Sequence, residues 1–331
     1  MKKHKNECIA VVAPRRGMGD CVSFYGIFKT IYKVSGNKLI LITHKKTSAK
    51  DIYKNNKIFK KIIYLKEKKR GFFYSFSEYI NLIKIFYSLK IYHVSKLFVL
   101  HGSFKYIITA KISGISLIEA VGEKYQRFFL KNKNRVYKNF FEKVLHPRTA
   151  SVKLIKSIFN LKNIEDNYFT LNNLKSFNNR KYIAIGLAAS GYERFWGKDN
   201  FIQVINFLTK KNFYKFILLS GKDQSSLENE IIKNFNQKKL HFIKTSQLSL
   251  NKIIYYLKDI KFYFGNDTGF AHLTVSHRIS SLILHGDAPP HDYSKFIIPI
   301  VNKNKIISKN AIMKISYDDA KKNINFLLKR Y

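Results

Sequence analysis

Short runs of apolar residues alternate along most of the chain with longer stretches in which apolar positions recur at helical spacing. The short runs predict strands that are buried on both faces, and the longer stretches predict amphipathic helices that cover a sheet. This alternation is typical of α/β proteins built on parallel sheets. In the first half it predicts strands at 9–13, 38–43, 61–65 and 96–100, and helices at 18–34, 73–89 and 134–160.

The same pattern resumes after an asparagine-rich polar stretch at 161–181, which we interpret as a linker between two domains. The second half predicts strands at 182–187, 216–220, 241–244, 261–265 and 281–285, and helices at 200–209, 223–235, 250–257, 269–276 and 317–330.

The predicted fold class is therefore α/β, with two doubly wound, Rossmann-like domains at 1–165 and 180–315. The terminal segment at 316–331 is expected to be a helix, and the N-terminal domain is one surface on which it could pack back. Ligands bind at the carboxyl ends of the strands in such sheets, so two domains that face each other are expected to hold the site in a cleft.

The composition narrows the class of protein. Hydrophobic residues make up 46% of the 331 positions, which is too many for a disordered chain. Lys and Arg number 61 against 21 Asp and Glu, so the formal net charge is +40. A positive field attracts a phosphorylated glycolipid, an anionic membrane or nucleic acid. The lysines are spread along the whole chain, however, and a biased genome would also produce this pattern.

Cysteine content and hydropathy favour a cytoplasmic protein. Cys8 and Cys21 give no disulfide framework, and the apolar run near the N-terminus is too short for a secretion signal. No segment has about 18 uninterrupted apolar residues, so we predict no membrane span and only peripheral membrane contact. The basic run at 66–70 with the aromatic residues at 71–74 is the best candidate for membrane or acceptor contact, and an ordinary solvated loop is the alternative.

The first of three junctions between a strand and a helix is a glycine-rich turn. Gly17 and Gly19 flank Met18 and allow a sharp turn and close approach to a ligand. The spacing fits neither the dinucleotide fingerprint nor the phosphate-binding P-loop. Asp20 follows at the start of the predicted helix, where a carboxylate either caps the helix or acts in catalysis.

The second junction follows the first strand of the second domain. Ser190 and Gly191 suit a tight loop that holds an anion, and Arg194 offers a planar fork for a diphosphate. Arg194 stands two positions before Trp196, the only tryptophan of the chain. The alternative is a surface cation beside a core aromatic residue.

The third junction, at 262–273, combines a strand, an Asn-Asp-Thr-Gly turn and a helix. We expect Asp267 to cap the helix and the N–H groups of its first turn to hold a phosphate. Thr268 adds a hydroxyl, and Gly269 permits close approach. His272 lies about one turn further on and is predicted to face the same ligand, with a buried core histidine as the alternative.

Together the three junctions resemble those of the ADP-heptose–lipopolysaccharide heptosyltransferases, glycosyltransferase family 9, which have the GT-B fold. The resemblance runs in order through most of the chain. Its segments are RRGMGD, AASGYERFW, GNDTGFAHL and LILHGDAPP. Arg194 stands where the family usually has lysine, Gly197 replaces a proline, and His285 replaces the usual phenylalanine before a glycine. These departures bear on the identity of the sugar more than on the fold.

The resemblance implies a role for each matching residue. Asp20 would take the proton from the acceptor hydroxyl, and Arg194 would hold the diphosphate of the donor. The N-terminal domain would bind the acceptor and the C-terminal domain the nucleotide sugar. Further residues assigned in this way are Ser190, Asp267, Thr268, Gly269 and His272 for the donor, Gly17, Met18 and Gly19 for the glycine loop, and Arg15 and Arg16 for the acceptor.

These assignments predict an inverting, metal-independent transferase that needs no cofactor besides its donor, ADP-heptose. The acceptor implied is an anionic glycolipid of lipopolysaccharide-core type at the cytoplasmic face of the inner membrane. Inversion needs one base and a stabilised leaving diphosphate, and no Asp-x-Asp triplet is present to chelate a metal ion. Closure of the two domains is expected to bring Asp20 to the donor.

Three other functions stay open from the sequence. The chain could use another nucleotide sugar, or epimerise one without an acceptor. The charge of +40 also suggests nucleic-acid binding, but no helix-turn-helix, zinc or RNP-type motif supports it.

Overall fold

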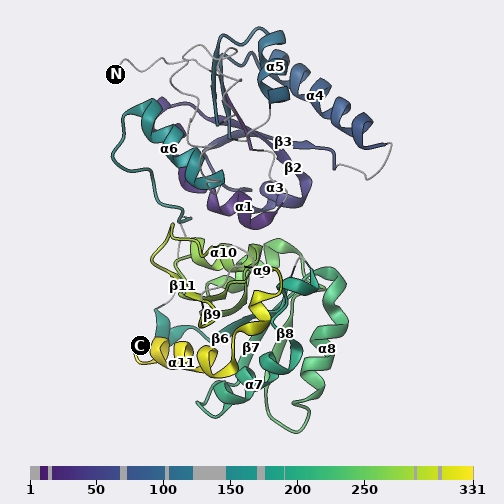
Figure 1. The fold of residues 1–331 in the computed structure, drawn as a ribbon, viewed down its shortest axis with the longest axis vertical. Coiled ribbons are helices and arrows are strands. Elements are labelled where there is room, and N and C mark those ends of the chain that lie inside the picture. Colours follow the sequence, from purple (N-terminus) through teal and green to yellow (C-terminus); the bar gives the residue numbers. More distant parts are fainter. Residues whose placement is uncertain are drawn as a thin grey trace. The chain divides into compact units, whose positions relative to one another are not determined.

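The structure is a computed structural model of the chain. It describes residues 8–13, 17–67, 73–100, 104–121, 147–169, 176–189, 191–286, 289–304 and 308–330. The chain divides into two compact units, Met1–Asn167 and Tyr168–Tyr331. Each unit is a parallel sheet with helices on both faces (Figure 1).

The sheet of the first unit has five strands in its described part, in the order β3-β2-β1-β4-β5. All neighbouring strands are parallel, with Ile9 paired to Leu39 on one side and to Lys96 on the other. The strands are β1 (Ile9–Val12), β2 (Leu39–His44), β3 (Phe59–Leu65), β4 (Lys96–Val99) and β5 (Leu117–Ala120). The order reverses between β1 and β4, which makes the end of β1 the switch point of this sheet.

Helices cover this sheet, and apolar residues from strands and helices form one core. The contacts include α4 against α5 and α2 against α6. The helices are α1 (Met18–Ser23), α2 (Tyr25–Ser35), α3 (Ala49–Ile52), α4 (Phe73–Ile91), α5 (Phe104–Ile112) and α6 (Pro147–Phe159), with the 3-10 turn η1 (Lys45–Thr47).

The sheet of the second unit has six strands in its described part, in the order β11-β10-β9-β6-β7-β8, again all parallel. The strands are β6 (Tyr182–Gly186), β7 (Lys215–Leu219), β8 (His241–Lys244), β9 (Ile260–Asn266), β10 (Ser281–Leu284) and β11 (Ile297–Ile300). Here the order reverses between β6 and β9, so these two strands flank the switch point.

The helices of the second unit pack around a core centred on Trp196 and Phe264. They are α7 (Lys198–Thr209), α8 (Ser225–Lys233), α9 (Leu250–Leu257), α10 (Gly269–Ser276) and α11 (Tyr317–Leu328), with the 3-10 turns η5 (Phe177–Asn179), η6 (Tyr192–Arg194), η7 (Lys222–Gln224) and η8 (Ala311–Lys314).

The terminal helix α11 belongs to the second unit. Its buried residues Ala320, Ile324 and Leu327 lie in the core of that unit, and the helix packs on α7. These contacts explain why the helix folds with the second unit, because its apolar face is buried there. Its packing on the N-terminal domain stays a prediction.

The predicted α/β fold class with two doubly wound domains is confirmed. One predicted helix differs from the structure, one is described only in part, and some elements were not predicted. The helix expected at 18–34 is two helices that break at Phe24, which has φ −86° and ψ −4°. The helix expected at 134–160 is described only from Pro147. The sequence pattern missed β5, β11, α3 and α5.

The two central strands of the second sheet come unusually close at a pair of glycines. Gly186 of β6 lies opposite Gly265 of β9. A Cβ atom on Gly265 would lie 2.4–2.6 Å from backbone atoms of Gly186, and one on Gly186 would lie 1.8 Å from the Tyr263 hydroxyl. Only glycine fits at both positions, and this close approach sets the strand ends from which the site loops leave.

Candidate functional site

The switch point of the second sheet brings the second and third junctions together. The loop at 187–197 follows β6, Asn266 ends the neighbouring strand β9, and Asp267 and Thr268 follow it. In a doubly wound sheet the loops on either side of the reversal diverge and leave a crevice at the carboxyl ends of the strands. The sequence placed candidate donor residues on these two loops, and the structure puts both loops at one edge of the sheet.

Asn266 ties the two loops to each other. Its side chain is fully buried, its Nδ2 donates to the carbonyl oxygens of Leu187 (3.1 Å) and Ala188 (3.2 Å), and its Oδ1 accepts from the Trp196 N–H at 3.3 Å. Sequence reasoning assigned Asn266 no role. Its position at the end of a buried strand indicates a structural role, because a buried side-chain amide needs hydrogen-bond partners from neighbouring loops.

Trp196 anchors the far end of the first loop. Its Nε1 donates to the carbonyl oxygen of Ile315 at 2.8 Å, and its ring packs edge-to-face on Phe201 and Phe264. Trp196 is therefore a core residue that fixes the loop. Arg194, at the end of η6, keeps its side chain at the surface. Ser190 lies outside the described residues, so its predicted contact with the donor stays a prediction.

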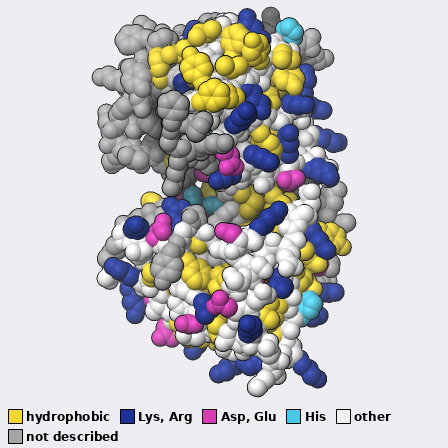
Figure 2. All heavy atoms as spheres, turned by 90° about the vertical axis from the view of Figure 1, so that its right-hand side faces the viewer, with side chains coloured by type: hydrophobic (Ala, Val, Ile, Leu, Met, Phe, Trp, Pro, Cys, Tyr) yellow, Lys and Arg dark blue, Asp and Glu magenta, His cyan; other side chains and the backbone are white. Residues whose placement is uncertain are grey.

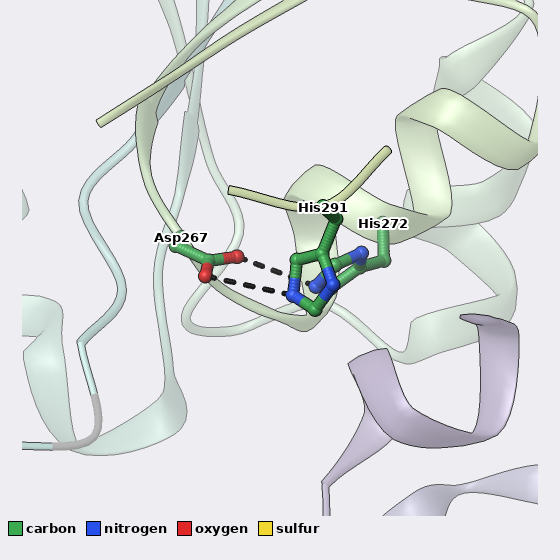
Figure 3. Close-up of side chains that lie close together, drawn as sticks. All are labelled: Asp267, His272 and His291. Carbon is green, nitrogen blue, oxygen red and sulfur yellow. Dashed lines mark ion pairs between the residues drawn. The ribbon is translucent and has the colours of Figure 1, made fainter. Parts of the chain in front are cut away.

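The carboxylate of Asp267 faces histidines instead of capping the helix. Its Oδ1 lies 3.3 Å from His272 Nε2, and its Oδ2 lies 3.4 Å from His285 Nδ1 and 3.8 Å from His291 Nε2. Figure 3 shows the imidazoles of His272 and His291 pointing at the two carboxylate oxygens. The expectation that Asp267 caps the helix is wrong, because the carboxylate turns toward these rings.

The protonation state of Asp267 follows from these neighbours. Burial raises the pKa of the carboxyl group, but the facing imidazoles of His272 and His285 lower it more, and the pKa lies well below its usual value. Asp267 is therefore ionised in the fold. A carboxylate of this kind accepts hydrogen bonds from hydroxyl groups or binds a cation.

Thr268 takes the N-cap position of α10, with φ −143° and ψ 173°. Its buried hydroxyl has no hydrogen-bond partner among the described residues. Gly269 opens the helix, and the His272 N–H donates to the Thr268 carbonyl oxygen at 3.2 Å. The helix N-terminus is thus present where the sequence predicted a seat for a phosphate.

His272 is buried on α10 beside Asp267, and its predicted contact with the donor stays a prediction. Its Nδ1 lies 2.6 Å from the hydroxyl of Tyr293, and the two rings stack with centroids 5.8 Å apart. Its Nε2 faces Asp267.

His285 and His291 join the site although the sequence assigned them no function. His285 directly follows β10, the neighbour of β9, and His291 lies in the segment before β11. In the sequence, His285 is notable only as a replacement for phenylalanine. Adjacent parallel strands end at the same edge, so a histidine directly after a strand was a signal that could have been used.

The first junction lies at the switch point of the first sheet. Gly17 is the N-cap of α1, and its N–H donates to Asp20 Oδ2 at 3.4 Å. Met18 and Asp20 are half-buried, and Gly19 is buried. The capping interpretation of Asp20 is therefore confirmed, and its catalytic role stays a prediction. Arg15 and Arg16, the predicted acceptor contacts, lie outside the described residues.

Comparisons with known proteins agree with the resemblance drawn from the motifs. The model of the family described as glycosyltransferase family 9 (heptosyltransferase) matches residues 146–324, more than half of the chain. That segment contains the loops of the second switch point. No curated protein matches the chain by sequence.

Solved structures with the same fold cover nearly the whole chain. A family 9 glycosyltransferase from Veillonella parvula has 13% identity and a TM-score of 0.78, over 100% of this chain and 99% of that one. E. coli ADP-heptose lps heptosyltransferase II has 15% identity and a TM-score of 0.73, over 98% of this chain and 99% of that one. E. coli heptosyltransferase WaaC with ADP-2-deoxy-2-fluoro heptose has 13% identity and a TM-score of 0.73, over 96% of this chain and 99% of that one.

Proposed function

The chain belongs to glycosyltransferase family 9 and is a glycosyltransferase, and we propose that it transfers heptose from ADP-heptose to an acceptor of lipopolysaccharide-core type, with inversion. The observation that carries the proposal is the pair of loops joined by Asn266 at the switch point of the second sheet. Donor and acceptor are supported by similar proteins, namely a heptosyltransferase with a bound ADP-heptose analogue and an ADP-heptose lps heptosyltransferase.

The donor would lie over the ends of β6 and β9. The N–H groups at the start of α10 and the guanidinium of Arg194 suit the two phosphates. Asp267 is ionised and would repel a phosphate, so we assign it to hydroxyl groups of the sugar, with which it can accept hydrogen bonds. Thr268 would add a hydroxyl next to the diphosphate, while Asn266 acts through the loops that it positions.

In the proposed reaction an acceptor hydroxyl oxygen attacks the anomeric carbon of the donor sugar. The bond from that carbon to the diphosphate breaks, and ADP leaves with the bonding electrons. Asp20 takes the hydroxyl proton, and inversion follows because the oxygen enters opposite the leaving group. The positive groups around the diphosphate stabilise its developing charge.

We propose that Mg²⁺ is not required for this reaction. Arg194 and the N-terminus of α10 supply positive charge for the leaving diphosphate without it, and the chain has no Asp-x-Asp triplet. Activity abolished by EDTA and restored by Mg²⁺ would contradict this.

The exposed face of α4 supports peripheral membrane contact. Its exposed apolar residues recur three or four positions apart, which puts them along one side of the helix. They are Phe76, Tyr79, Ile83, Tyr87 and Ile91, and their side chains are 47–69% exposed. Ile112 of α5, the helix that packs on α4, is also exposed. We call these six residues the α4 face.

The surroundings of the α4 face favour an anionic membrane as its partner. Figure 2 shows hydrophobic side chains gathered on the side of the first unit that carries α4 and α5, with Lys and Arg beside them. Lys84, Lys90 and Lys111 are among the exposed cations there. Apolar residues beside lysines bind anionic bilayers by insertion and by charge. Residues 68–72 of the basic-aromatic run predicted for this contact lie outside the described residues.

We therefore propose that the enzyme works at the cytoplasmic face of the inner membrane, where an anionic glycolipid acceptor would be embedded. None of the helices in the described parts of the chain has the length and apolar character to span a bilayer. Contact through the α4 face would be peripheral.

One experiment tests the donor and the reaction together. The protein is screened by thermal shift against ADP-heptose and against GDP- and UDP-sugars, and the donor that stabilises it is incubated with a heptose-free lipopolysaccharide core. We expect ADP-heptose to raise the melting temperature most and ADP to be released only when the core is present. Stabilisation by a UDP-sugar, with isomerised sugar formed in the absence of acceptor, would favour epimerisation.

A further inference from the structure

The side chains of Asp267, His272 and His291 form a compact cluster of metal-ligating groups. One ligand atom from each lies within 4.8 Å of the other two. They come from three separate segments: the turn after β9, helix α10, and the stretch before β11. Figure 3 shows the carboxylate and both rings pointing toward one another. Ligands from separate segments of a folded sheet edge are typical of metal sites that form only in the native state.

The distances in the cluster suit an ion better than direct hydrogen bonds. Asp267 Oδ1 lies 3.3 Å from His272 Nε2, and Asp267 Oδ2 lies 3.8 Å from His291 Nε2. Charge-assisted hydrogen bonds between such groups are shorter, about 2.7–2.9 Å. Ligand bonds of about 2.0–2.1 Å in a tetrahedral site put neighbouring ligand atoms roughly 3.3 Å apart. The distance from Asp267 Oδ1 to His272 Nε2 already has this value, and ligand atoms of all three residues lie within 4.8 Å of one another, so His291 would have to move inward when an ion binds.

His285 gives an independent indication of a missing ligand. Its side chain is 1% exposed, and Nδ1 points at Asp267 Oδ2 from 3.4 Å. Neither ring nitrogen of His285 has a hydrogen-bond partner among the described residues, and the same is true of Asp267 Oδ1. Buried polar atoms without partners are costly and rare in native proteins. An ion bound by the carboxylate would satisfy Asp267 and leave Oδ2 for His285.

Tyr293 supplies the outer support that a ligating histidine needs. Its hydroxyl lies 2.6 Å from His272 Nδ1. When Nε2 of His272 binds an ion, the proton is on Nδ1. The Nδ1–H group then donates a hydrogen bond to this hydroxyl, which fixes the orientation and the tautomer of the ring.

We propose that Asp267, His272 and His291 bind a divalent transition-metal ion of the zinc class, with His285 orienting the carboxylate and one coordination position left open. Two imidazoles and one carboxylate favour Zn²⁺, Co²⁺ or Ni²⁺ over Mg²⁺, which prefers an all-oxygen shell. The proposal therefore agrees with transfer that does not need Mg²⁺. The metal proposal does not rest on the proposed transfer reaction, although Asp267 is also assigned to the sugar there.

The test measures binding of the metal alone, without donor or acceptor. Chelator-treated full-length protein is titrated with Co²⁺ and followed by its visible absorption, and Zn²⁺ affinity is then measured by calorimetry and by displacement of Co²⁺. We expect one ion per chain, an absorption band of the intensity typical of four-coordinate Co²⁺, and no heat with Mg²⁺. His291→Asn and His285→Phe should each weaken Zn²⁺ binding by about tenfold or more.

The matched control is His241→Asn, which removes an exposed histidine on β8, far along the sheet from β10. This variant should bind Zn²⁺ like the unmodified protein, and circular dichroism should show that all three variants are folded. The proposal is overturned if the unmodified protein gives no Co²⁺ band, or if His291→Asn and His285→Phe bind as tightly as His241→Asn. Neither result bears on transferase activity, which is measured separately.

Discussion

His277, just after α10, is a buried histidine whose ring the fold keeps neutral. Its Nδ1 lies 2.8 Å from the carbonyl oxygen of Leu273, and the ring packs edge-to-face on Phe169. Because a carbonyl oxygen only accepts, Nδ1 carries the proton. Burial lowers the pKa of the ring from 6.5 to about 4, although the hydrogen bond to Leu273 raises it. Between these two pKa values, His277 is therefore protonated in the unfolded chain and neutral in the folded chain.

The sign of the resulting pH dependence is fixed. The contribution of His277 to stability is complete above the unfolded pKa of about 6.5 and is lost as the pH falls toward about 4. The free energy of unfolding should drop by about 2 kcal/mol from this residue between about pH 7.5 and pH 5. Urea unfolding at the two pH values should show a smaller drop in His277→Gln than in the unmodified protein. An equal drop in both would contradict this, and exposed His241→Gln serves as the control.

At the same scale, sequence motifs pointed to part of the site. Asp267 and His272 stand in a recognisable turn-helix motif, and both were assigned to the donor, but their direct contact was not predicted. His291 lies 24 positions beyond Asp267 and has no motif around it, so only the fold brings it near. Asn266 was visible in the motif, but its contacts with the other loop depend on strands β6 and β9 being neighbours, which the sequence order does not reveal.

At the scale of elements, helix α4 allows a direct test of membrane binding through the α4 face. Replacement of Tyr79 and Tyr87 by serine removes two exposed rings from the α4 face, while the control replaces the exposed Tyr214 and Tyr255 of the second unit. We expect the α4 variant to partition about thirtyfold more weakly onto vesicles that contain phosphatidylglycerol, because the two rings together lose about 2 kcal/mol of burial. Cosedimentation measures this, and melting temperatures check the folds. Equal partitioning of the two double variants would exclude the α4 face.

Element prediction failed where local signals were weak. The missed strands β5 and β11 have four residues each, and β11 contains Pro299, which normally argues against a strand. It is tolerated because β11 is an edge strand of the sheet. The helix expected at 18–34 kept its amphipathic pattern across Phe24, so its break could not be read from periodicity. The longer buried strands, such as β9, were predicted nearly to the residue.

At the scale of the whole molecule, each unit presents its predicted chemistry at the switch point of its own sheet. Asp20 follows β1 in the first unit, and Asp267 follows β9 in the second. The alternation of strands and helices was enough to predict both sheets, because parallel α/β units leave few other arrangements. Specificity could not be predicted in the same way. We attribute it to positions where the sequence departs from the family pattern, such as Arg194 and His285, and to Arg15 and Arg16, which lie outside the described residues.

The measurement that decides most directly whether the chain works as proposed is turnover by Asp20→Asn. Asparagine keeps the size of the side chain and an oxygen that can accept from the Gly17 N–H, but it cannot take a proton. With ADP-heptose and a heptose-free core, we predict a kcat at least about 100-fold lower than that of the unmodified protein and a donor Kd changed by less than about twofold. Full turnover by Asp20→Asn, with donor binding intact, would contradict the proposed base and the joint action of the two units.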